Sequence, residues 1–524
     1  MILSKLQKMI SNKYLILLIG LVNITKIFLA KGGFMTEPDE GIYYKSFTVL
    51  KRISDFQFRD ALHQIFASNG RPLGVVIDLI PASLQVIWAK LWHFNVFETH
   101  SMWVIFGFNF LIFLFILFYI YKITQIIFQN NILALFSVLF YSLLTNSYIY
   151  LRHVFPYDIS ILFFLYVMHK LLKFYIEDKE DPDIFQMLKL GIISFLGFML
   201  YPGNFPLFLA NFLLLVGFQI INPKHKKYLI FSSVFAFISG TVLIIIPVEI
   251  LSCIGKNSYI YSLLNLSGTI LQGDFHESAI FLFKYFLDVE GITGILWIIG
   301  LIIFIYFVPE ILRSHNINFR SSALIFLVFS GLFIFYTFIL SFWLHKMVVY
   351  GRIIHQFIPV FSIFSTTGYY ILFRKFLKSY SSICILFMLI LSLVNYYSNF
   401  VQYLRISYPK SVYWKFLRHT DPNLIQEVSE YEESWSNLPS AHYIQNEKII
   451  NTKDTIIAVN TQYFFPVEHL SKFKAYMAPE NYKLILKGKH FLNFKAYQYE
   501  GYTPNARKII RKIKPEIKIY KKKD

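Results

Sequence analysis

Residues 101–122 read SMWVIFGFNFLIFLFILFYIYK, and Lys122 is the first charged residue in this stretch. A hydrocarbon core about 30 Å thick is crossed by a helix of roughly 20 apolar residues, so the stretch predicts a membrane span. The same measure predicts further spans along the chain. Together the predicted spans are 14–30, 101–122, 132–150, 157–176, 187–202, 205–221, 228–250, 291–311, 321–343, 356–373 and 380–398. The sequence therefore predicts a polytopic α-helical membrane protein with about eleven transmembrane helices.

The composition supports this class. Hydrophobic residues make up 56% of the 524 residues, aromatic residues 19% and charged residues only 15%. Soluble proteins contain roughly 25% charged residues, so a soluble globular protein is excluded. The net charge of +19 arises from loop lysines and arginines, which hold helices against anionic lipid. No nucleic-acid motif accompanies this charge, so no nucleic-acid partner is expected. The two cysteines, Cys253 and Cys384, form neither a disulfide framework nor a metal-ligand spacing.

Residues 72–94 are a further apolar stretch, but Asp78, Pro81, Gln85 and Lys90 give it an amphipathic pattern. A charged residue at the centre of a membrane helix costs about 2.5–3.5 kcal/mol on insertion scales. We therefore expect this helix to lie at the membrane interface. If residues 72–94 do not cross the membrane, most of the basic loops lie on the same side as the N-terminus. The positive-inside rule assigns this side to the cytoplasm. The first span lacks an obvious small-residue cleavage site and is expected to remain as a signal anchor.

With this topology, several loops share the outer face of the membrane. They are residues 31–100, 151–157, 201–205, 251–290 and 344–355 and everything after 398. We expect residues 1–398 to form a transmembrane catalytic domain, with interfacial helices in the outer loop 31–100. Residues 399–524 are expected to form a small extracytoplasmic α/β domain.

The pattern within this C-terminal domain predicts three strands and a helix. The strand-like runs are 455–460, 482–486 and 494–499, and the helical pattern covers 423–434. The basic tail from Arg507 to Asp524 is expected to be solvated or to lie along the membrane.

An acidic segment follows the first span and carries the strongest functional signal. Residues 37–40 read Glu-Pro-Asp-Glu. Acids close to hydrocarbon are costly and usually functional, so Asp39 is a candidate general base with Glu40 beside it. The alternative for Asp39 is a cap on the helix that is expected to begin at Gly41.

Cations on the outer face predict an anionic ligand. Arg71 precedes Pro72 at the start of the predicted interfacial helix, and arginine can bind a phosphate or carboxylate through two hydrogen bonds. Lys346, Arg352 and His355 flank the span that begins at residue 356. The alternative for all four is contact with lipid headgroups.

Three more outer segments hold polar residues. Arg152, His153 and Asp158 lie in one short connection, where Asp158 could cap the next helix and pair with Arg152, or His153 could line a cavity. Residues 201–204, Tyr-Pro-Gly-Asn, predict a tight turn whose Tyr201 and Asn204 could also bind a sugar. The loop residues Asp274, His276 and Glu277 match no metal-site spacing, so a solvated loop is expected and no metal ion or other cofactor is predicted.

These motifs resemble the C-type (GT-C) membrane glycosyltransferases, in particular the branch of protein O-mannosyltransferases and aminoarabinose transferases. The segment Asp39-Glu40-Gly41-Ile42-Tyr43-Tyr44 is similar to the acidic signature of that family. Arg71-Pro72-Leu73 is similar to its second loop element, and Tyr350-Gly351-Arg352 leading to Pro359 resembles its late span. The resemblance covers residues 1–400. No W-W-D motif occurs, so an oligosaccharyltransferase is not expected.

The resemblance implies inverting transfer of a sugar from a polyprenyl-phosphate donor to a glycan, lipid or protein acceptor. It implies that Asp39 is the base, with Glu40 its neighbour, and that Arg352 and Arg71 hold the donor phosphate. Lys346 and His355 are further candidates for the phosphate. The candidates for lining the substrate site are Tyr43, Arg152, His153, Asp158, Tyr201, Asn204, His276 and Glu277.

Two other functions stay open at this point. One is a transporter or flippase of lipid-linked sugars, which should place charged residues or broken helices near mid-membrane. The other is an O-antigen polymerase or ligase, whose large outer loop usually lies between late spans. The richness in Lys, Ile, Phe and Asn favours a bacterial inner membrane.

Overall fold

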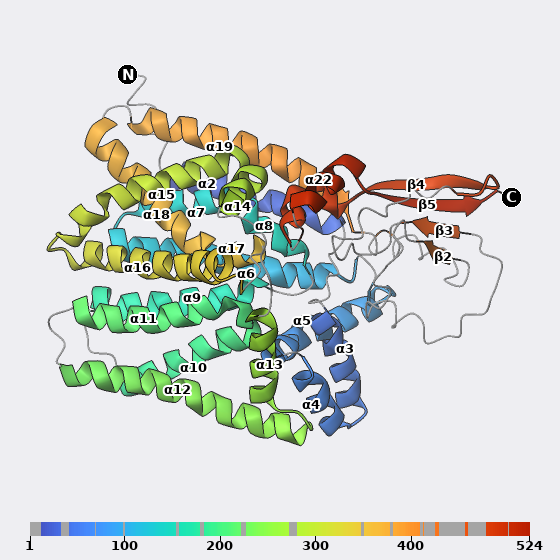
Figure 1. Ribbon diagram of the computed structural model, residues 1–524, viewed down its shortest axis with the longest axis horizontal. Coiled ribbons are helices and arrows are strands. Elements are labelled where there is room, and N and C mark those ends of the chain that lie inside the picture. The colour runs from blue at the N-terminus through green and yellow to red at the C-terminus, as the bar shows by residue number, and fades with distance from the viewer. Residues whose placement is uncertain are drawn as a thin grey trace.

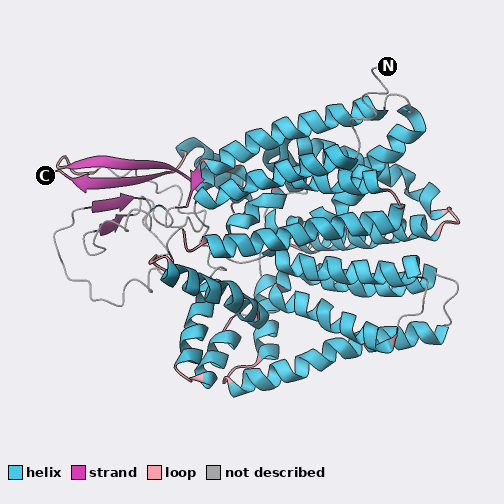
Figure 2. Cartoon of the chain, turned by 180° about the vertical axis from the view of Figure 1, so that it is seen from behind, coloured by secondary structure: helices cyan, strands magenta, loops and turns pink. Residues whose placement is uncertain are grey.

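The computed structural model describes residues 12–32, 41–68, 70–97, 100–153, 157–178, 183–221, 227–271, 280–346, 351–377, 381–408, 412, 425–428, 456–459, 478–500, 502 and 504–523. Long helices lie side by side in a bundle, and a small sheet projects from one end of it (Figures 1 and 2). The predicted class, a polytopic α-helical membrane protein with a small C-terminal sheet region, is confirmed.

The bundle helices run alternately in opposite directions along the long axis of the molecule (Figure 1). They are α2 (Asn12–Thr25), α6 (Trp103–Phe128), α7 (Asn131–Leu143), α9 (Tyr157–Leu172), α10 (Ile184–Leu200), α11 (Phe205–Ile221), α12 (Lys227–Ile254), α15 (Gly291–Leu312), α16 (Ile317–Phe333), α18 (Ile358–Leu372) and α19 (Ser381–Leu404). Several continue as 3₁₀ or π turns, namely η1 (Lys26–Gly32), η4 (Lys173–Asp178), η6 (Phe286–Glu290), η7 (Ile334–Trp343) and η8 (Phe373–Leu377).

Other helices connect the bundle helices or lie at the ends of the bundle. They are α3 (Gly41–Ser54), α4 (Phe58–Phe66), α5 (Pro72–Leu91), α8 (Asn146–Ile149), η3 (Tyr150–Arg152), η5 (Pro202–Asn204), α13 (Tyr259–Leu271), α14 (Ile280–Tyr285) and α17 (Gly351–His355).

Within the described ranges, nine helices are long and apolar enough to cross a membrane, or up to ten if a bent pair counts as one span. Pro72–Leu91 is one of the nine by length and composition. It nevertheless lies beyond the ends of α9, α10 and α11, beside α3 and α4 (Figure 1). The other eight of these nine helices correspond to eight of the eleven predicted spans. The remaining three predicted spans correspond to the bent pair and to the shorter helices α10 and α18.

The two faces of α5 differ in polarity. Its polar residues Asp78 and Gln85 are fully buried. Its exposed face carries Ile80, Leu84 and Ile87, all more than half exposed in the isolated chain. A helix that shows an apolar stripe outward suits contact with lipid rather than with water.

Helix α18 is the centre of the bundle, and every residue from Ile358 to Tyr369 is buried. Small residues allow α15 to cross it closely. A Cβ atom on Gly368 would lie 2.1 Å from the carbonyl oxygen of Gly300, so no larger residue fits there without moving a helix. Ser365 donates a hydrogen bond to the carbonyl oxygen of Trp297 at 2.8 Å and joins the same two helices.

The predicted span 132–150 is not one straight helix. Helix α7 and the segment Asn146–Arg152 meet at a bend of 70°. The carboxylate of Glu290 is fully buried there and accepts hydrogen bonds from the backbone N–H of Thr145 (2.6 Å) and of Asn146 (2.9 Å). These N–H groups have lost their helical partners at the bend, and a buried carboxylate supplies new acceptors.

The C-terminal sheet has the strand order β1-β4-β5-β3-β2. Its strands are β1 (Ile406–Ser407), β2 (Ile425–Val428), β3 (Ile456–Val459), β4 (Tyr482–His490) and β5 (Glu516–Lys522). β1 and β4 are parallel, as are β2 and β3, and β5 lies antiparallel between β4 and β3. The predicted strands at 455–460 and 482–486 correspond to β3 and β4.

Three predictions for this region are wrong. Residues 425–428 form strand β2 rather than helix, and 494–499 form a 3₁₀-helix, η13 (Lys495–Tyr499), whose aromatic rings are buried. The basic tail folds as helix α22 (Pro504–Ile513) and strand β5. In β5, Ile517 and Ile519 are buried and alternate with half-buried residues. Side chains of a strand alternate between its two faces, so one face is buried although the segment is rich in lysine.

Candidate active site

Arg71 lies at the start of α5, where Pro72 occupies the first helical position. Its guanidinium group lies over the ring of Tyr201, 5.0 Å from the ring centre. Tyr201 ends α10 and precedes η5. Two residues predicted from separate motifs, a phosphate ligand and a sugar ligand, are therefore in direct contact.

The contact continues to Arg352 through a second tyrosine. The rings of Tyr201 and Tyr157 meet edge to face with centres 5.4 Å apart. The Tyr157 hydroxyl accepts a hydrogen bond from Nη1 of Arg352 at 3.4 Å. The two arginines predicted to bind the donor phosphate thus lie at the two ends of one pair of tyrosine rings.

Glu500 is a partner of Arg352 that the sequence did not reveal. The distance from Nε of Arg352 to Oε2 of Glu500 is 3.6 Å, and the two side chains are 18% and 7% exposed. Oε1 of Glu500 also accepts a hydrogen bond from the backbone N–H of Arg352 at 3.0 Å and from the hydroxyl of Tyr150 at 3.3 Å. The C-terminal region therefore reaches back to the bundle and positions α17.

Asp158 and His355 form a buried pair beside this contact. Nε2 of His355 lies 2.5 Å from Oδ1 of Asp158, and both side chains are almost fully buried. The ring of Tyr150 lies 4.5 Å from that of His355. The predicted pairing of Asp158 with Arg152 is wrong, because α17 brings His355 to the first turn of α9 and Arg152 faces elsewhere.

Arg152 is fully buried and binds the segment where α19 ends and β1 begins. It donates hydrogen bonds to the carbonyl oxygens of Tyr403 (3.0 Å) and Ile406 (3.2 Å). Its guanidinium group also lies over the rings of Tyr403 and Tyr408, at 5.0 and 4.8 Å. Arg152 thus binds one carbonyl group in the last turn of α19, where helical partners are missing, and one in the strand that follows.

His153 is also buried, and its ring packs against aromatic neighbours. Its centre lies 5.1 Å from that of Tyr150 and 6.0 Å from that of Tyr497. The carbonyl oxygen of His153 accepts a hydrogen bond from the side chain of Asn109 at 2.7 Å. Burial and the neighbouring tyrosines raise the pKa of Tyr497 well above its usual range, so this hydroxyl stays protonated.

Tyr43 is buried between α3 and α5. Its hydroxyl donates a hydrogen bond to Oε1 of Gln85 at 2.6 Å. Burial, and in smaller part the nearby Asp78, raises the pKa of Tyr43 well above its usual range. This bond holds α3 against α5, and Tyr43 is fully buried between the two helices.

The remaining predicted residues divide into two groups. Asn204 is buried in η5, and Lys346 is exposed just after η7. Asp39, Glu40, Asp274, His276 and Glu277 lie outside the described residues. Within the part of the chain that the structure describes, no three His, Cys, Asp or Glu side chains gather as metal ligands would.

The cluster so formed consists of Arg71, Tyr150, Tyr157, Asp158, Tyr201, Arg352, His355 and Glu500, and we call it the arginine–tyrosine cluster. It lies at the end of the bundle that carries α3, α4, α5 and the sheet (Figure 1). Sequence reasoning missed Tyr150, Tyr157 and Glu500. Tyr157 directly precedes the predicted site residue Asp158, and this position is the sequence feature that could have indicated a role for it.

No protein-family model matches the sequence, and no curated protein matches it. Among solved structures, the crystal structure of the Archaeoglobus fulgidus oligosaccharyltransferase in complex with Zn and sulfate is similar to this chain, with a TM-score of 0.42 and 12% sequence identity. The similarity covers 86% of this chain and 59% of that enzyme, so this chain spans less than two thirds of its length. The spans and the arginine–tyrosine cluster themselves define the class: an integral membrane protein with a polar cluster at one end of its helical bundle.

Proposed function

We propose that the protein is a glycosyltransferase that moves a sugar from a polyprenyl-phosphate donor to an acceptor on the extracytoplasmic face of a membrane. The observation that carries this proposal is the meeting of Arg71 and Arg352 across Tyr201 and Tyr157. Two guanidinium groups and tyrosine rings at the end of a membrane bundle suit a donor whose phosphate sits at the interface while its tail stays in lipid.

The proposed reaction inverts the configuration of the sugar. A hydroxyl or amine of the acceptor attacks the anomeric carbon, and the bond from that carbon to the phosphate oxygen breaks. Asp39 takes the proton of the nucleophile, with Glu40 beside it, and the polyprenyl phosphate leaves with the bonding electrons. Arg71 and Arg352 stabilise the charge of the leaving phosphate, so the reaction needs no metal ion or other cofactor.

The remaining residues of the cluster act as supports in this proposal. Glu500 and the Asp158–His355 pair fix α17, and with it the guanidinium group of Arg352. Lys346 is exposed and precedes Arg352 by a few residues in the sequence. Its positive charge would help to attract an anionic donor. Tyr201 lies at the end of α10, and Asn204 lies in η5, which follows it. In this proposal a sugar bound near Arg71 lies close to these two residues.

The test begins with the lipid-linked sugar that accumulates in cells lacking the protein. Transfer of that labelled sugar is then measured in membranes that contain equal amounts of wild-type protein, Asp39→Asn or Arg71→Gln. A general base contributes about 10²–10⁴-fold in rate, so Asp39→Asn should lose at least a hundredfold. Asp55→Asn, at an exposed turn after α3, is the matched control and should keep full activity. Full activity of Asp39→Asn would refute the proposed base.

A flippase of lipid-linked sugars is the second candidate, and the bent span favours it. The bend of 70° after α7 is flanked by two fully buried charged residues, Lys26 and Glu290. Broken helices and buried charges are features of transporters. Proteoliposomes distinguish the two functions, because a flippase moves the lipid-linked sugar without an acceptor, whereas a transferase releases polyprenyl phosphate only when an acceptor is present.

A further inference from the structure

A second polar region lies at the opposite end of the bundle from the arginine–tyrosine cluster. A cavity of about 720 Å³ opens there between the end of α6, the start of α7, the end of α9 with η4, and the start of α16. None of the residues that line it takes part in the proposed transfer reaction.

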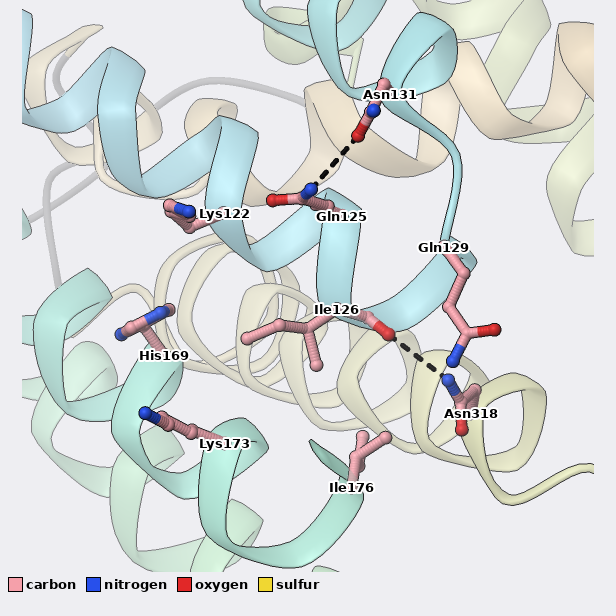
Figure 3. Close-up of a pocket in the computed structure, with 9 residues that line it drawn as sticks. All are labelled: Lys122, Gln125, Ile126, Gln129, Asn131, His169, Lys173, Ile176 and Asn318. Carbon is pink, nitrogen blue, oxygen red and sulfur yellow. Dashed lines mark hydrogen bonds between the residues drawn. The ribbon is translucent and has the colours of Figure 1, made fainter. Parts of the chain in front are cut away.

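One wall of this cavity is basic. Figure 3 shows Lys122, His169 and Lys173 along one side, from α6, α9 and η4. Both lysines are half-buried, and Nδ1 of His169 is buried without a hydrogen-bond partner. Among the described residues that line the cavity there is no carboxylate. The wall therefore carries the positive charges of two lysines and one buried histidine nitrogen, and no lining residue supplies a negative charge to pair with the lysines.

The other wall supplies amide groups and the starts of two helices. Asn131 begins α7, and Asn318 lies in the first turn of α16. The side chain of Gln125 donates to Oδ1 of Asn131 at 3.0 Å, and that of Asn318 donates to the carbonyl oxygen of Ile126 at 3.1 Å (Figure 3). These bonds fix the amides around the cavity. Helix starts carry partial positive charge, which adds to that of the lysines.

The surroundings favour a lipid over a free ion. The cavity is also lined by Ile126 and Ile176, and it lies where the candidate membrane helices Trp103–Phe128 and Tyr157–Ile176 end. Helix ends of membrane spans lie near the lipid headgroups. Its volume exceeds what one inorganic phosphate needs. Basic pockets between transmembrane helices on the cytoplasmic side are known to bind anionic headgroups.

We propose that this cavity binds the phosphate group of an anionic phospholipid from the leaflet at this end of the bundle. Lys122 and Lys173 hold the phosphate oxygens, and the amides of the opposite wall bind the polar part of the headgroup. The site is separate from the transfer reaction, so its test does not depend on the proposed activity.

The experiment is native mass spectrometry of the full-length protein, delipidated and titrated with phosphatidylglycerol or with phosphatidylcholine. The wild type should bind one phosphatidylglycerol more tightly than the rest and should show no such preference for phosphatidylcholine. A basic residue near a charged lipid contributes about fivefold in affinity, so Lys122→Gln and Lys173→Gln should each weaken this binding about fivefold, and the double variant roughly 25-fold.

Two controls make the result specific. Lys170→Gln removes a neighbouring charge that lies over the ring of Tyr166 and does not line the cavity, and it should bind like the wild type. Lys122→Arg with Lys173→Arg keeps both charges and should retain binding. Equal phosphatidylglycerol affinity of the wild type and both Gln variants would overturn the proposal. Displacement of the lipid by millimolar inorganic phosphate would also overturn it, because the ligand would then be a soluble anion.

Discussion

Replacing Glu500 with alanine should loosen the backbone of α17 around Arg352. The Glu500 carboxylate accepts hydrogen bonds from the backbone N–H of Arg352 and from the hydroxyl of Tyr150, and it is almost fully buried. A hydrogen bond to a charged group contributes about 1.5–3 kcal/mol. Loss of both should lower the free energy of local opening by about 2–4 kcal/mol, since part of the gain is recovered by relaxation and water.

This change can be measured directly by hydrogen exchange of the Arg352 amide, because the substitution removes the carboxylate that accepts its hydrogen bond. Each 1.4 kcal/mol corresponds to tenfold, so exchange of the peptide containing residues 351–355 should become roughly 30- to 1,000-fold faster. The measurement uses the solubilised full-length protein. Glu500→Gln keeps an acceptor oxygen and should accelerate exchange by no more than about tenfold.

Glu516→Ala is the matched control, since Glu516 pairs with Lys487 within the sheet, 2.9 Å away. It should leave the exchange of residues 351–355 unchanged. Unchanged exchange in Glu500→Ala would refute the reasoning, because the C-terminal region would then play no part in positioning Arg352.

Three further variants test other contacts. Asp158→Asn removes one partner of a buried pair, so the thermal midpoint of the solubilised protein should fall by the equivalent of about 3–5 kcal/mol; a midpoint equal to that of the wild type would contradict the pairing with His355. Arg152→Lys cannot bind two carbonyl oxygens and two rings at once, so limited proteolysis near residues 403–408 should become faster, whereas cleavage at the wild-type rate would contradict the anchoring role. Gly368→Ala forces a methyl group against the carbonyl of Gly300, so the yield of monodisperse protein should drop sharply, while Gly331→Ala, where a Cβ has open space, should not change it.

The membrane fold could be predicted from the sequence because hydropathy and length dominate a helix in lipid. The spans at 101–122 and 157–176 correspond to α6 and α9 with η4. The bend after α7 could not be predicted, because it depends on Glu290, which lies far away in the chain and caps the broken turn. A local pattern carries no information about such a partner.

The candidate site was predictable only in part, because a local sequence pattern identifies single residues and not their distant partners. Arg71 is predictable as the arginine that precedes Pro72 at a helix start, and Arg352 as a cation that departs from the positive-inside rule. The structure brings both to one pair of tyrosines. The partners of Asp158 and Arg152 were not predictable, since these two residues lie close in sequence with opposite charges, which predicts that they pair with each other. Only the packing of α17 and α19 decides that these residues turn to His355 and to backbone carbonyls.

The C-terminal region shows where a composition signal misleads. The density of lysine in the tail suggested a solvated segment, yet Ile517 and Ile519 alternate at a strand period and are buried in β5. The aromatic run 494–499 has strand propensity, but Tyr497 and Tyr499 pack inward from a 3₁₀-helix against residues of other elements. Tertiary packing overrode propensity in this case.

The most direct test of the central claim is to ask which side of the membrane the arginine–tyrosine cluster faces. His315 and Lys346 are exposed at the two ends of the span Ile317–Trp343, and Lys346 lies at the end nearer to α17. Each is changed to cysteine in a background without Cys253 and Cys384, and intact cells are treated with a membrane-impermeant thiol reagent. If the cluster faces outward, Lys346→Cys is labelled in intact cells and His315→Cys is labelled only after the cells are opened. Labelling in the reverse pattern would place the cluster in the cytosol and contradict transfer on the outer face.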